Sequence, residues 1–376
     1  MSIENPADLL RSLFDHAVEA ADPMQSLARH LPPKPEGRVI VVGAGKASAR
    51  MAEAVEAVWG PCQGLVITRY GYARPCQGIE IIEAAHPVPD AAGQAATERM
   101  LTLLQGLGED DFVLALISGG ASSLLVAPST GITLPEKQEV NAALLASGAP
   151  IQQMNVVRKH LSRVKGGQLA AAAYPATMLS LMISDVPGDD MSMIGSGPTV
   201  GDASVNSDAT AILERWGIAV PNSVTEALQK RSGVVAPDDV RLSRVKNRIY
   251  AAPRQSLDAA EALATNAGLR VVTRRGNGVG GPNAEYALAL AIALNQAPGI
   301  WGLACDTDGV DGGAEVAGAI IAPDTLQRAR EVKSDPHAAL DANDAHGFFE
   351  RVGGQVVTGP TLTNVNDFRA IVVAPQ

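Results

Sequence analysis

The sequence predicts an α/β fold with two domains, and three observations lead to this prediction. The 376 residues are more than one ordinary hydrophobic core organises. Hydrophobic residues make up 46% of the chain and aromatic residues only 3%, so small aliphatic side chains must build the core, as buried parallel strands under Ala-rich helices require. Short β-branched runs also alternate with apolar residues at helical spacing, which is the rhythm of βαβ units in a parallel sheet.

The N-terminal part begins with a helix. Asn5 is a typical N-cap, proline follows at the first helical position, and apolar residues recur at helical spacing up to Ala21. The β-branched run 38–42 is bounded by glycines and predicts the first strand. Further strands are expected at 64–69, 79–83, 112–117 and 177–183, and helices at about 47–58, 90–105, 135–147 and 151–172.

Polar turns and short helices fill the stretch from about 200 to 248, and apolar strands resume at 249–252. We therefore place the boundary near 240, so that the two domains comprise residues 1–240 and 241–376. The second domain repeats the α/β pattern. Its strands are expected at 269–273, 300–305, 317–321 and 369–373, and its helices at about 256–268, 283–295, 324–333 and 343–352.

Composition excludes several classes of partner. A net charge of −10 disfavours nucleic acid, and we interpret the basic stretch 241–248 as a solvated connection. No apolar run reaches 18 residues, so no membrane span is expected. The three cysteines have no metal-site spacing and indicate a reducing cytoplasm. A soluble cytoplasmic protein is expected, and a homodimer is compatible with the sequence.

A glycine turn follows the first predicted strand and opens a helix. Its sequence, from Gly43 through Gly45 and Lys46 to Ser48, places backbone N–H groups and a helix dipole where a phosphate or carboxylate binds. The spacing is that of neither a dinucleotide fingerprint nor a Walker loop, and Arg69 stands where an NAD enzyme has a carboxylate. Tight packing explains the glycines equally well, but Lys46 favours function.

Three more polar turns follow predicted strands, at the edge of the sheet where ligands bind in parallel α/β folds. They are the turns 86–90, 118–123 and 184–190, which are rich in glycine, serine and aspartate. In the second domain, three aspartates follow the strand 300–305 without the spacing of an EF-hand and favour a Mg²⁺ or substrate role. The segment 358–367 is dense in hydroxyls and amides and is typical of a binding site. The basic residues between Arg158 and Lys165, on a helix expected to end at glycine, indicate an anion site or plain dipole partners.

Taken together, these motifs resemble the glycerate 2-kinase family, whose C-terminal half is the MOFRL domain. The resemblance rests on the blocks VVGAGKAS, AAHPVPD, LISGGASSLL, NVVRKHLSRVKGGQLA, ISDVPGDD, GSGPT, CDTDGVDG and VTGPTLTNVNDFRAI. It implies an N-terminal Rossmann-like domain and a C-terminal MOFRL-type α/β domain with the active site in a cleft between them. It further implies phosphorylation of D-glycerate at the 2-hydroxyl with ATP and Mg²⁺, giving 2-phosphoglycerate and ADP; members have also been labelled hydroxypyruvate reductases.

The resemblance also implies roles for particular residues. Lys46 corresponds to an active-site lysine, and Asp189, with Asp185 as second candidate, polarises the glycerate hydroxyl. The residues expected to hold the metal are Asp306, Asp308 and Asp311. Those expected to bind substrate or phosphate are Gly43, Gly45, His86, Ser118, Gly119, Gly120, Ser122, Ser123, Arg158, Lys165, Asn283, Glu285, Thr358, Thr361, Asn364 and Asp367.

The chain departs from the family at one place. After Thr273 it lacks a further helix and strand that members usually carry, and Pro282 stands where many have an arginine. Either a stretch of the natural chain is absent from this sequence or the gene has lost it, and the intact mass of the purified protein would separate the two. Two alternatives stay open: an NAD(P)H-dependent hydroxypyruvate reductase, suggested by the glycine turn, and a binding protein that has lost catalysis.

Overall fold

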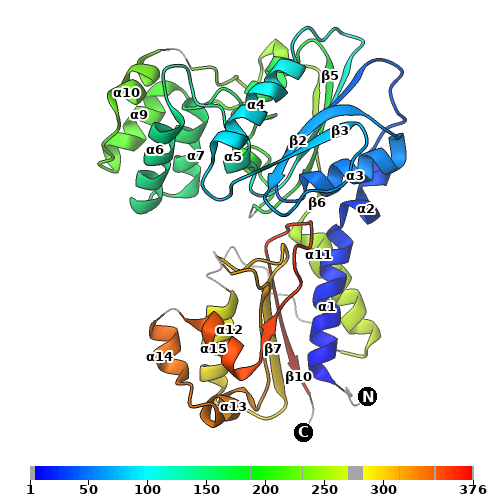
Figure 1. Ribbon diagram of the computed structural model, residues 1–376, viewed down its shortest axis with the longest axis vertical. Helices are drawn as coiled ribbons and strands as arrows, with labels where there is room; N and C mark the ends of the chain where they lie inside the picture. The colour runs from blue at the N-terminus through cyan, green and yellow to red at the C-terminus, as the bar shows by residue number, and fades with distance from the viewer. Residues whose placement is uncertain are drawn as a thin grey trace. The chain divides into compact units, whose positions relative to one another are not determined.

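The computed structural model describes residues 5–186, 188–230, 232–269, 283–312, 314–342 and 344–374. It divides into two compact units, each with its own sheet (Figure 1). One comprises Ser26–Ala251, and the other combines Met1–Gln25 with Ala252–Gln376. The predicted α/β fold is confirmed.

The unit 26–251 is built on a six-stranded sheet in which every neighbouring pair of strands is parallel. The strands are β1 (Val39–Ala44), β2 (Gln63–Arg69), β3 (Ile79–Ala84), β4 (Phe112–Ile117), β5 (Thr177–Ile183) and β6 (Val245–Ala251). Their order is β3-β2-β1-β4-β5-β6, the order of dinucleotide-binding sheets. The direction of succession reverses between β1 and β4, which makes the carboxyl ends of these two strands the expected binding edge.

Helices cover both faces of this sheet. Helix α3 (Ser48–Trp59) packs on β1, β2 and β4, and α4 (Ala91–Leu103) packs on β2 and β3. The α4 face contains a core of completely buried aliphatic side chains, among them Ile40, Val42 and Met100. Shorter elements are α5 (Ala121–Leu124), α8 (Gln168–Ala173), η1 (Leu27–His30), η2 (Ile194–Ser196) and η3 (Val240–Leu242).

Four helices with a core of their own form a separate cluster in this unit: α6 (Leu134–Ala146), α7 (Ile151–His160), α9 (Asn206–Arg215) and α10 (Asn222–Gln229). The predicted capping box of α6, between Thr133 and Glu136, is present. The expected helix 151–172 is wrong as one element, because it ends at His160 and α8 starts only at Gln168. Gly166 and Gly167 between them have φ of 57° and 79°, a backbone conformation that no α-helix contains.

The other unit is built on an antiparallel sheet of order β10-β7-β8-β9. Its strands are β7 (Ile300–Asp306), β8 (Gly318–Ile321), β9 (Gln355–Val356) and β10 (Asp367–Val373). The helices are α1 (Pro6–Ala21), α11 (Pro253–Asn266), α12 (Asn283–Leu294), α13 (Thr325–Glu331), α14 (Pro336–Asp341) and α15 (Ala345–Val352); the short α2 is Pro23–Ser26. Alternate residues of β7 enter two cores, because Ala304 packs with α12 and α15 while Leu303 and Cys305 pack with α1 and α11.

The structure divides the chain differently from the predicted boundary near 240. Strand β6, placed by the sequence in the second domain, pairs in parallel with β5 and completes the first sheet. Helix α1, expected in the first domain, packs against α11, β7 and β10 instead (Figure 1). The apolar face of α1 shows that the helix must pack against another surface, but it does not identify that surface. Tertiary packing therefore determines where α1 lies.

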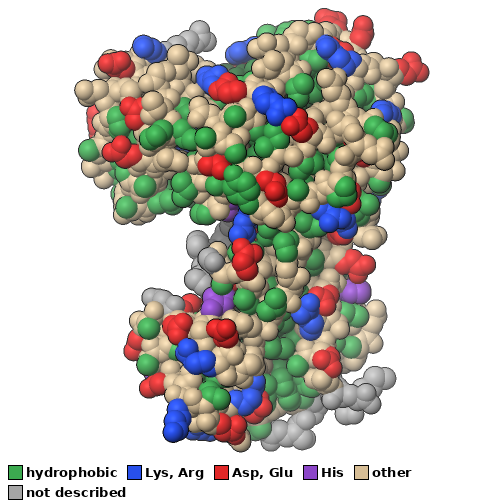
Figure 2. Space-filling view, in the orientation of Figure 1, with side chains coloured by type: hydrophobic (Ala, Val, Ile, Leu, Met, Phe, Trp, Pro, Cys, Tyr) green, Lys and Arg blue, Asp and Glu red, His purple; other side chains and the backbone are tan. Residues whose placement is uncertain are grey.

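No helix in the described ranges combines the length and apolarity needed to cross a membrane. On the face seen in Figure 2, basic and acidic side chains are interspersed and no extended basic patch is present.

Candidate active-site loops

The candidate residues of the unit 26–251 follow four strands of the parallel sheet. Lys46 follows β1, the loop 118–123 follows β4, Asp185 follows β5, and His86 follows β3. Because β1, β4 and β5 are neighbours in one parallel sheet, their carboxyl ends meet at one edge. The sheet therefore gathers residues that are up to about 140 positions apart in the sequence.

The backbone of the turn after β1 is fully used inside the fold. The N–H groups of residues 45–48 each donate to an oxygen of the protein. The acceptors are Ile67 O at 3.1 Å, Gly119 O at 2.8 Å, Ser118 Oγ at 3.0 Å and Gly45 O at 3.2 Å. These N–H groups are therefore not available to an anion, contrary to the expectation from sequence.

Gly43 and Gly45 have packing roles. A Cβ atom on Gly43 would lie 2.5 Å from the carbonyl oxygen of Leu116, and one on Gly45 would lie 2.1 Å from Oγ of Ser118. The two glycines thus let the β1 turn lie directly against the end of β4. What the turn presents beyond this contact is the half-buried side chain of Lys46.

Gly120 joins three of the predicted residues. It has φ of 84°, and a Cβ there would lie 3.0 Å from Cδ2 of His86 and 3.2 Å from Cγ of Lys46. His86 and Lys46 therefore flank the same glycine. Among the described residues, the N–H groups of Gly119, Gly120 and Ser122 donate to no protein acceptor, so this loop offers the donors that the first turn lacks.

Lys165 supports this loop from the interior of the unit, where its side chain is 1% exposed. Its Nζ donates to Ser122 O at 2.8 Å, to Leu125 O at 3.2 Å and to Gly195 O at 3.5 Å. Burial, followed by the positive charges of Lys137 and Arg158, lowers its pKa well below the usual value. Lys165 therefore holds the loop 118–123 in position through these hydrogen bonds. The sequence alone did not show whether Lys165 supports the loop or contacts a ligand directly.

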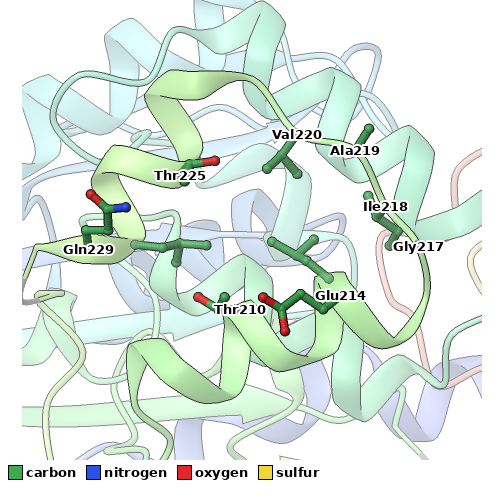
Figure 3. Close-up of a pocket in the computed structure, with 10 residues that line it drawn as sticks. Thr210, Glu214, Gly217, Ile218, Ala219, Val220, Thr225 and Gln229 are labelled. Atoms are coloured by element: carbon green, nitrogen blue, oxygen red, sulfur yellow. The ribbon is translucent and has the colours of Figure 1, made fainter.

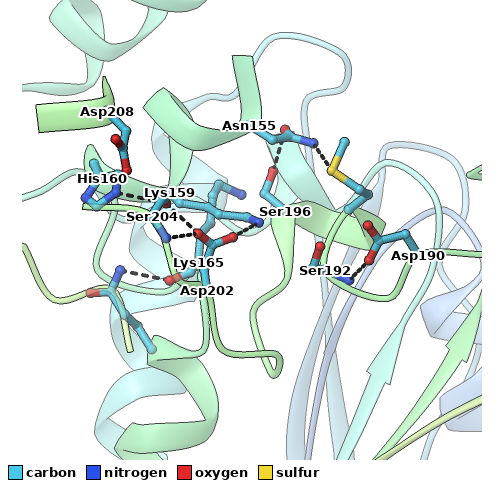
Figure 4. A network of polar contacts seen from close by, with 12 residues as sticks. Asn155, Lys159, His160, Lys165, Asp190, Ser192, Ser196, Asp202, Ser204 and Asp208 are labelled. Carbon is cyan, nitrogen blue, oxygen red and sulfur yellow. Dashed lines mark hydrogen bonds and ion pairs between the residues drawn. The ribbon is translucent and has the colours of Figure 1, made fainter. Parts of the chain in front are cut away.

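A chain of polar side chains runs from this loop to helix α7, and Figure 4 shows its part between Ser196 and Asn155. Ser122 Oγ and Ser196 Oγ are 2.8 Å apart, and Ser196 donates to Asn155 Oδ1 at 3.1 Å. Arg158 Nη1 lies 3.4 Å from the same Asn155 oxygen. The structure thus connects the predicted Ser122 and Arg158 through two residues that were not singled out.

The loop after β5 carries the predicted carboxylates. Asp185 is half-buried, whereas Asp189 is exposed. Asp189 has φ of 55°, a strained conformation for a residue with a Cβ, and its N–H donates to Val186 O at 3.1 Å. The neighbouring Asp190 accepts from the N–H of Ser192 at 2.9 Å and so stabilises the turn.

The unit containing β7 holds the expected metal-site aspartates. Asp306 ends β7, and its carboxylate accepts from the N–H of Asp308 at 3.1 Å. Asp308 is completely buried and accepts from the N–H of Val310 at 2.9 Å. Its other oxygen lies 3.5 Å from the amide nitrogen of Asn364.

Asp311 has a different set of partners from the one expected. It accepts from the N–H groups of Asn283 and Ala284 at 2.7 Å each, at the start of α12, and lies 3.2 Å from Nε2 of His346. Burial alone would raise its pKa, but hydrogen bonds from His346, Ala284 and Asn283 outweigh burial and lower it. Within the described ranges, no three acidic, His or Cys side chains are placed to hold a metal ion together. Asp311 therefore caps a helix, and the three aspartates do not form one ligand set.

The loop 358–367 packs against the aspartate loop. A Cβ on Gly309 would lie 2.2 Å from the carbonyl oxygen of Gly359, and the Thr361 hydroxyl donates to the carbonyl oxygen of Thr307. Thr358 uses its hydroxyl within its own turn, donating to Gly359 O at 2.7 Å.

Asn283 joins Asp311 to Asp367, because its amide nitrogen donates to Asp367 at 2.7 Å. Glu285 lies apart from this pair and accepts from the N–H of Ala345 at 3.4 Å. The predicted strand 269–273 beyond Leu269 and the turn with Pro282 lie outside the described residues, as does Pro187.

A cavity of about 440 Å³ lies elsewhere, between α9 and α10 (Figure 3). Mostly apolar side chains line it, including Leu213, Ile218 and Leu228, and none of the predicted site residues is among the lining residues. We do not assign it to the chemistry.

Three buried polar side chains near the predicted site residues were not singled out from the sequence: Asn155, Ser196 and Lys137. Asn155 and Ser196 belong to blocks already singled out, but only the fold shows that their side chains meet. Lys137 stands among ordinary polar residues of α6, and nothing in its spacing distinguishes it from a solvated lysine, yet it is 3% exposed.

Comparison with known proteins agrees with this architecture. Residues 9–229 match a family model described as a domain of unknown function, DUF4147, and residues 255–367 match the MOFRL family. The chain is 36% identical to the D-glycerate 2-kinase of Thermotoga maritima, over 97% of each chain. The crystal structure of glycerate kinase from Thermotoga maritima superposes with a TM-score of 0.83 at 35% identity, covering 97% of this chain and 99% of that one.

A protein of Agrobacterium vitis is 47% identical over 97% of this chain and 94% of its own length. It is described, only provisionally, as a hydroxypyruvate reductase. The alignment spans 414 positions, more than the 376 residues of this chain, so some residues of that relative have no counterpart here.

Proposed function

The chain belongs to the glycerate kinase family, and on this premise we propose that it transfers the γ-phosphoryl group of ATP to the 2-hydroxyl of D-glycerate, releasing 2-phosphoglycerate and ADP. The proposal rests above all on the full-length similarity to D-glycerate 2-kinase, together with the gathering of Lys46, His86 and the 118–123 loop at one sheet edge. Phosphoryl transfer depends mainly on positioning and charge neutralisation, which such loops supply without a covalent nucleophile.

In this reaction Lys46 acts electrostatically. Its ammonium group, presented by a turn whose backbone is fully hydrogen-bonded, stabilises negative charge on the transferred group. The N–H groups of Gly119, Gly120 and Ser122 donate to anionic oxygens of the ligand. His86 flanks Gly120 and fixes the shape of this cradle.

Asp189 accepts the proton of the glycerate 2-hydroxyl as the phosphoryl group is transferred. It is exposed to incoming substrate, and its strained backbone is typical of a residue held in place for function. Asp185, which directly follows the buried Ser184, is the second candidate.

Mg²⁺ would neutralise charge on the nucleotide phosphates. Asp306, half-buried at the end of β7, fits a site of this kind, because Mg²⁺ is usually bound by one or two carboxylates together with substrate phosphates and waters. Asp308 is completely buried and already accepts from the N–H of Val310, so it would add negative charge behind Asp306 without contacting the ion. Asp311 is not expected to bind Mg²⁺, because its two oxygens already accept hydrogen bonds from the N–H groups at the start of α12, and one of them contacts His346. Asn364 and Asp367 orient this loop through Asp308 and Asn283.

The end of β2 disfavours an NADH-dependent reductase. NAD-binding sheets place a carboxylate there to bind the ribose, whereas Arg69, which would suit only NADP, ends β2 here and stacks over the ring of Tyr72, 5.3 Å from its centroid. Ser48 also replaces the third glycine of the fingerprint, and its hydroxyl donates to Leu116 O at 3.0 Å.

The test is ADP release with ATP, Mg²⁺ and D-glycerate, followed by enolase, which converts only 2-phosphoglycerate to a product absorbing in the ultraviolet. We expect glycerate-dependent ADP and an enolase signal. ADP without that signal would place the phosphate on the 3-hydroxyl. No ADP, with NAD(P)H oxidation by hydroxypyruvate, would establish the reductase instead, and a ligand-induced rise in Tm without turnover would establish a binding protein.

A further inference from the structure

Three cationic side chains lie close together in the interior of the unit 26–251. Lys137 is 3% exposed, Lys165 is 1% exposed, and Arg158 is half-buried. They come from α6, from the loop before α8 and from α7. The positive charges of Lys137 and Arg158 both act on Lys165, so the three form one electrostatic group.

All hydrogen-bond partners of this group are neutral. Lys137 Nζ donates to the carbonyl oxygen of Leu161 at 2.7 Å, and Lys165 donates to three carbonyl oxygens. Arg158 donates to the amide oxygens of Asn141 at 3.3 Å and Asn155 at 3.4 Å. Among the described residues, none of the three cations contacts a carboxylate. Burying cations without a counter-charge is costly, so a carboxylate or phosphate that fills this place would be bound strongly.

A neighbouring lysine in the same region is buried together with a carboxylate partner. Lys159, one residue after Arg158, is also 3% exposed, but it forms an ion pair with Asp202, whose carboxylate in turn accepts from Ser204 (Figure 4). A buried lysine of α7 can therefore have a carboxylate partner. Lys137, Arg158 and Lys165 differ from it because none of them has one among the described residues.

Hydroxyl groups next to the three basic residues are held in one arrangement. Ser196 is completely buried and has φ of 63°, and glycines with left-handed φ lie on both sides of it. This strained turn directs its hydroxyl to Asn155, while Ser122 lies 2.8 Å away on the loop with free N–H donors. Strain kept at a buried serine in a donor-rich loop is typical of a ligand site.

We propose that Arg158, backed by Lys137 and Lys165 and lined by Asn155, Ser196 and Ser122, is the subsite that binds the carboxylate of the hydroxy-acid substrate. Arg158 contacts the carboxylate through its outer N–H groups, since Nη2 donates to no atom of the described chain. Lys137 is a positioning residue, which contributes its charge through Arg158 without contacting the ligand. This inference rests on the proposed function for the identity of the acid.

Carboxylate binding is then coupled to proton uptake. Burial, with a smaller contribution from Arg158, lowers the pKa of Lys137 to about 7, so part of the protein carries a neutral Lys137 at neutral pH. A bound anion favours the charged form and raises this pKa. The groups that face Lys137 are Arg158 of α7 and the carbonyl oxygen of Leu161, which follows α7. Lys165 lies beyond them, and burial holds its pKa well below the usual value as well.

The experiment is calorimetric titration of the full chain with D-glycerate, without nucleotide, at pH 7.5 in two buffers of different ionisation enthalpy. We expect Lys137→Met to weaken glycerate binding on the order of tenfold and to reduce proton uptake. The matched control is Lys246→Met, which removes the same charge from an exposed side chain and should change neither quantity. Equal glycerate affinity in Lys137→Met and the unaltered protein would overturn the subsite.

A second variant, Asn155→Asp, tests the same idea without removing a cation. It places a carboxylate 3.4 Å from Arg158 at nearly constant volume and loses only a 3.6 Å contact with the sulfur of Met193. We expect Tm of the free protein to rise by about 2–4 °C while glycerate binding weakens at least tenfold. A fall in both would indicate a structural role and overturn the proposal.

Two further outcomes separate the subsite from the proposed function. Weaker binding of ADP, with glycerate affinity unchanged, would assign the cations to a phosphate and overturn the carboxylate assignment alone. Failure of the unaltered protein to bind glycerate would overturn both proposals. Glycerate binding that depends on Lys137, in a protein without kinase activity, would support the subsite and contradict the proposed function.

Discussion

At the scale of single residues, Lys46 is the side chain on which the proposed chemistry depends most directly. We expect Lys46→Ala to lower kcat by at least about 100-fold, because it removes one positioned charge from the transferred group. Tm should stay close to that of the unaltered protein, since the turn is held by its backbone. Lys230→Ala, at an exposed lysine, is the control, and a near-normal kcat for Lys46→Ala would remove it from the site.

Asp189 and Asp190 offer a comparison between adjacent carboxylates. Asp189→Asn should lower kcat by about 100-fold or more, the size expected for loss of a proton acceptor, and Asn tolerates the φ of 55°. Asp190→Asn keeps an oxygen for the N–H of Ser192 and should leave kcat nearly unchanged. Steady-state kinetics of both variants decides between them, and equal losses would indicate disturbance of the loop instead of catalysis.

The pair of His346 and Asp311 makes stability depend on pH. The hydrogen bond to Asp311 raises the pKa of His346 above 6.5 against the effect of burial, so its stabilising contribution is full below pH 6.5 and is lost as pH rises through the raised value. Asp311 has a lowered pKa and loses its contribution only as pH falls below 3.8. His346→Asn should therefore lower Tm at pH 6 more than at pH 9. The exposed His337→Asn should not, and equal losses at both pH values would contradict an ionic role for His346.

At the scale of elements, the loop after β4 depends on one glycine. Gly120→Ala strains the backbone by about 1–2 kcal/mol and places a methyl group against His86 and Lys46, so we expect a clear loss of kcat. Gly131→Ala is a matched control, because Gly131 has φ of 92° but nothing within 4 Å of the added methyl. Both should lose similar stability in denaturant titrations, and only Gly120→Ala should lose activity. Similar kcat values would show that the cradle tolerates a side chain.

At the scale of the whole molecule, the two units have separate cores and should unfold in separable steps. Phe348 is completely buried against Phe349 in one unit, and Phe348→Ala should destabilise that unit by about 3–5 kcal/mol. Met100→Ala should act on the other unit by about 2–5 kcal/mol. Calorimetry should show each substitution moving a different transition. If both moved together, the chain would unfold as one cooperative unit.

Much of the fold could be predicted because local signals were strong. Short apolar runs located β4 and β5 to the residue, and the capping box located the start of α6. Two of the errors concern signals that local sequence does not contain. Helicity across Gly166 and Gly167 depends on the sign of φ, and the partner of α1 depends on which apolar surface is available to it.

The sequence by itself determined the α/β class, the family and the loops that carry the polar residues, because these follow from periodicity, composition and ordered motifs. The tertiary structure decided which of those residues meet. In the folded chain, the N–H groups of the β1 turn donate to protein oxygens, and Asp311 accepts from the N–H groups at the start of α12. Ser122 is connected to Arg158 through Ser196 and Asn155. Hydrogen-bond partners and burial depend on segments far apart in the chain, and only packing brings those segments together.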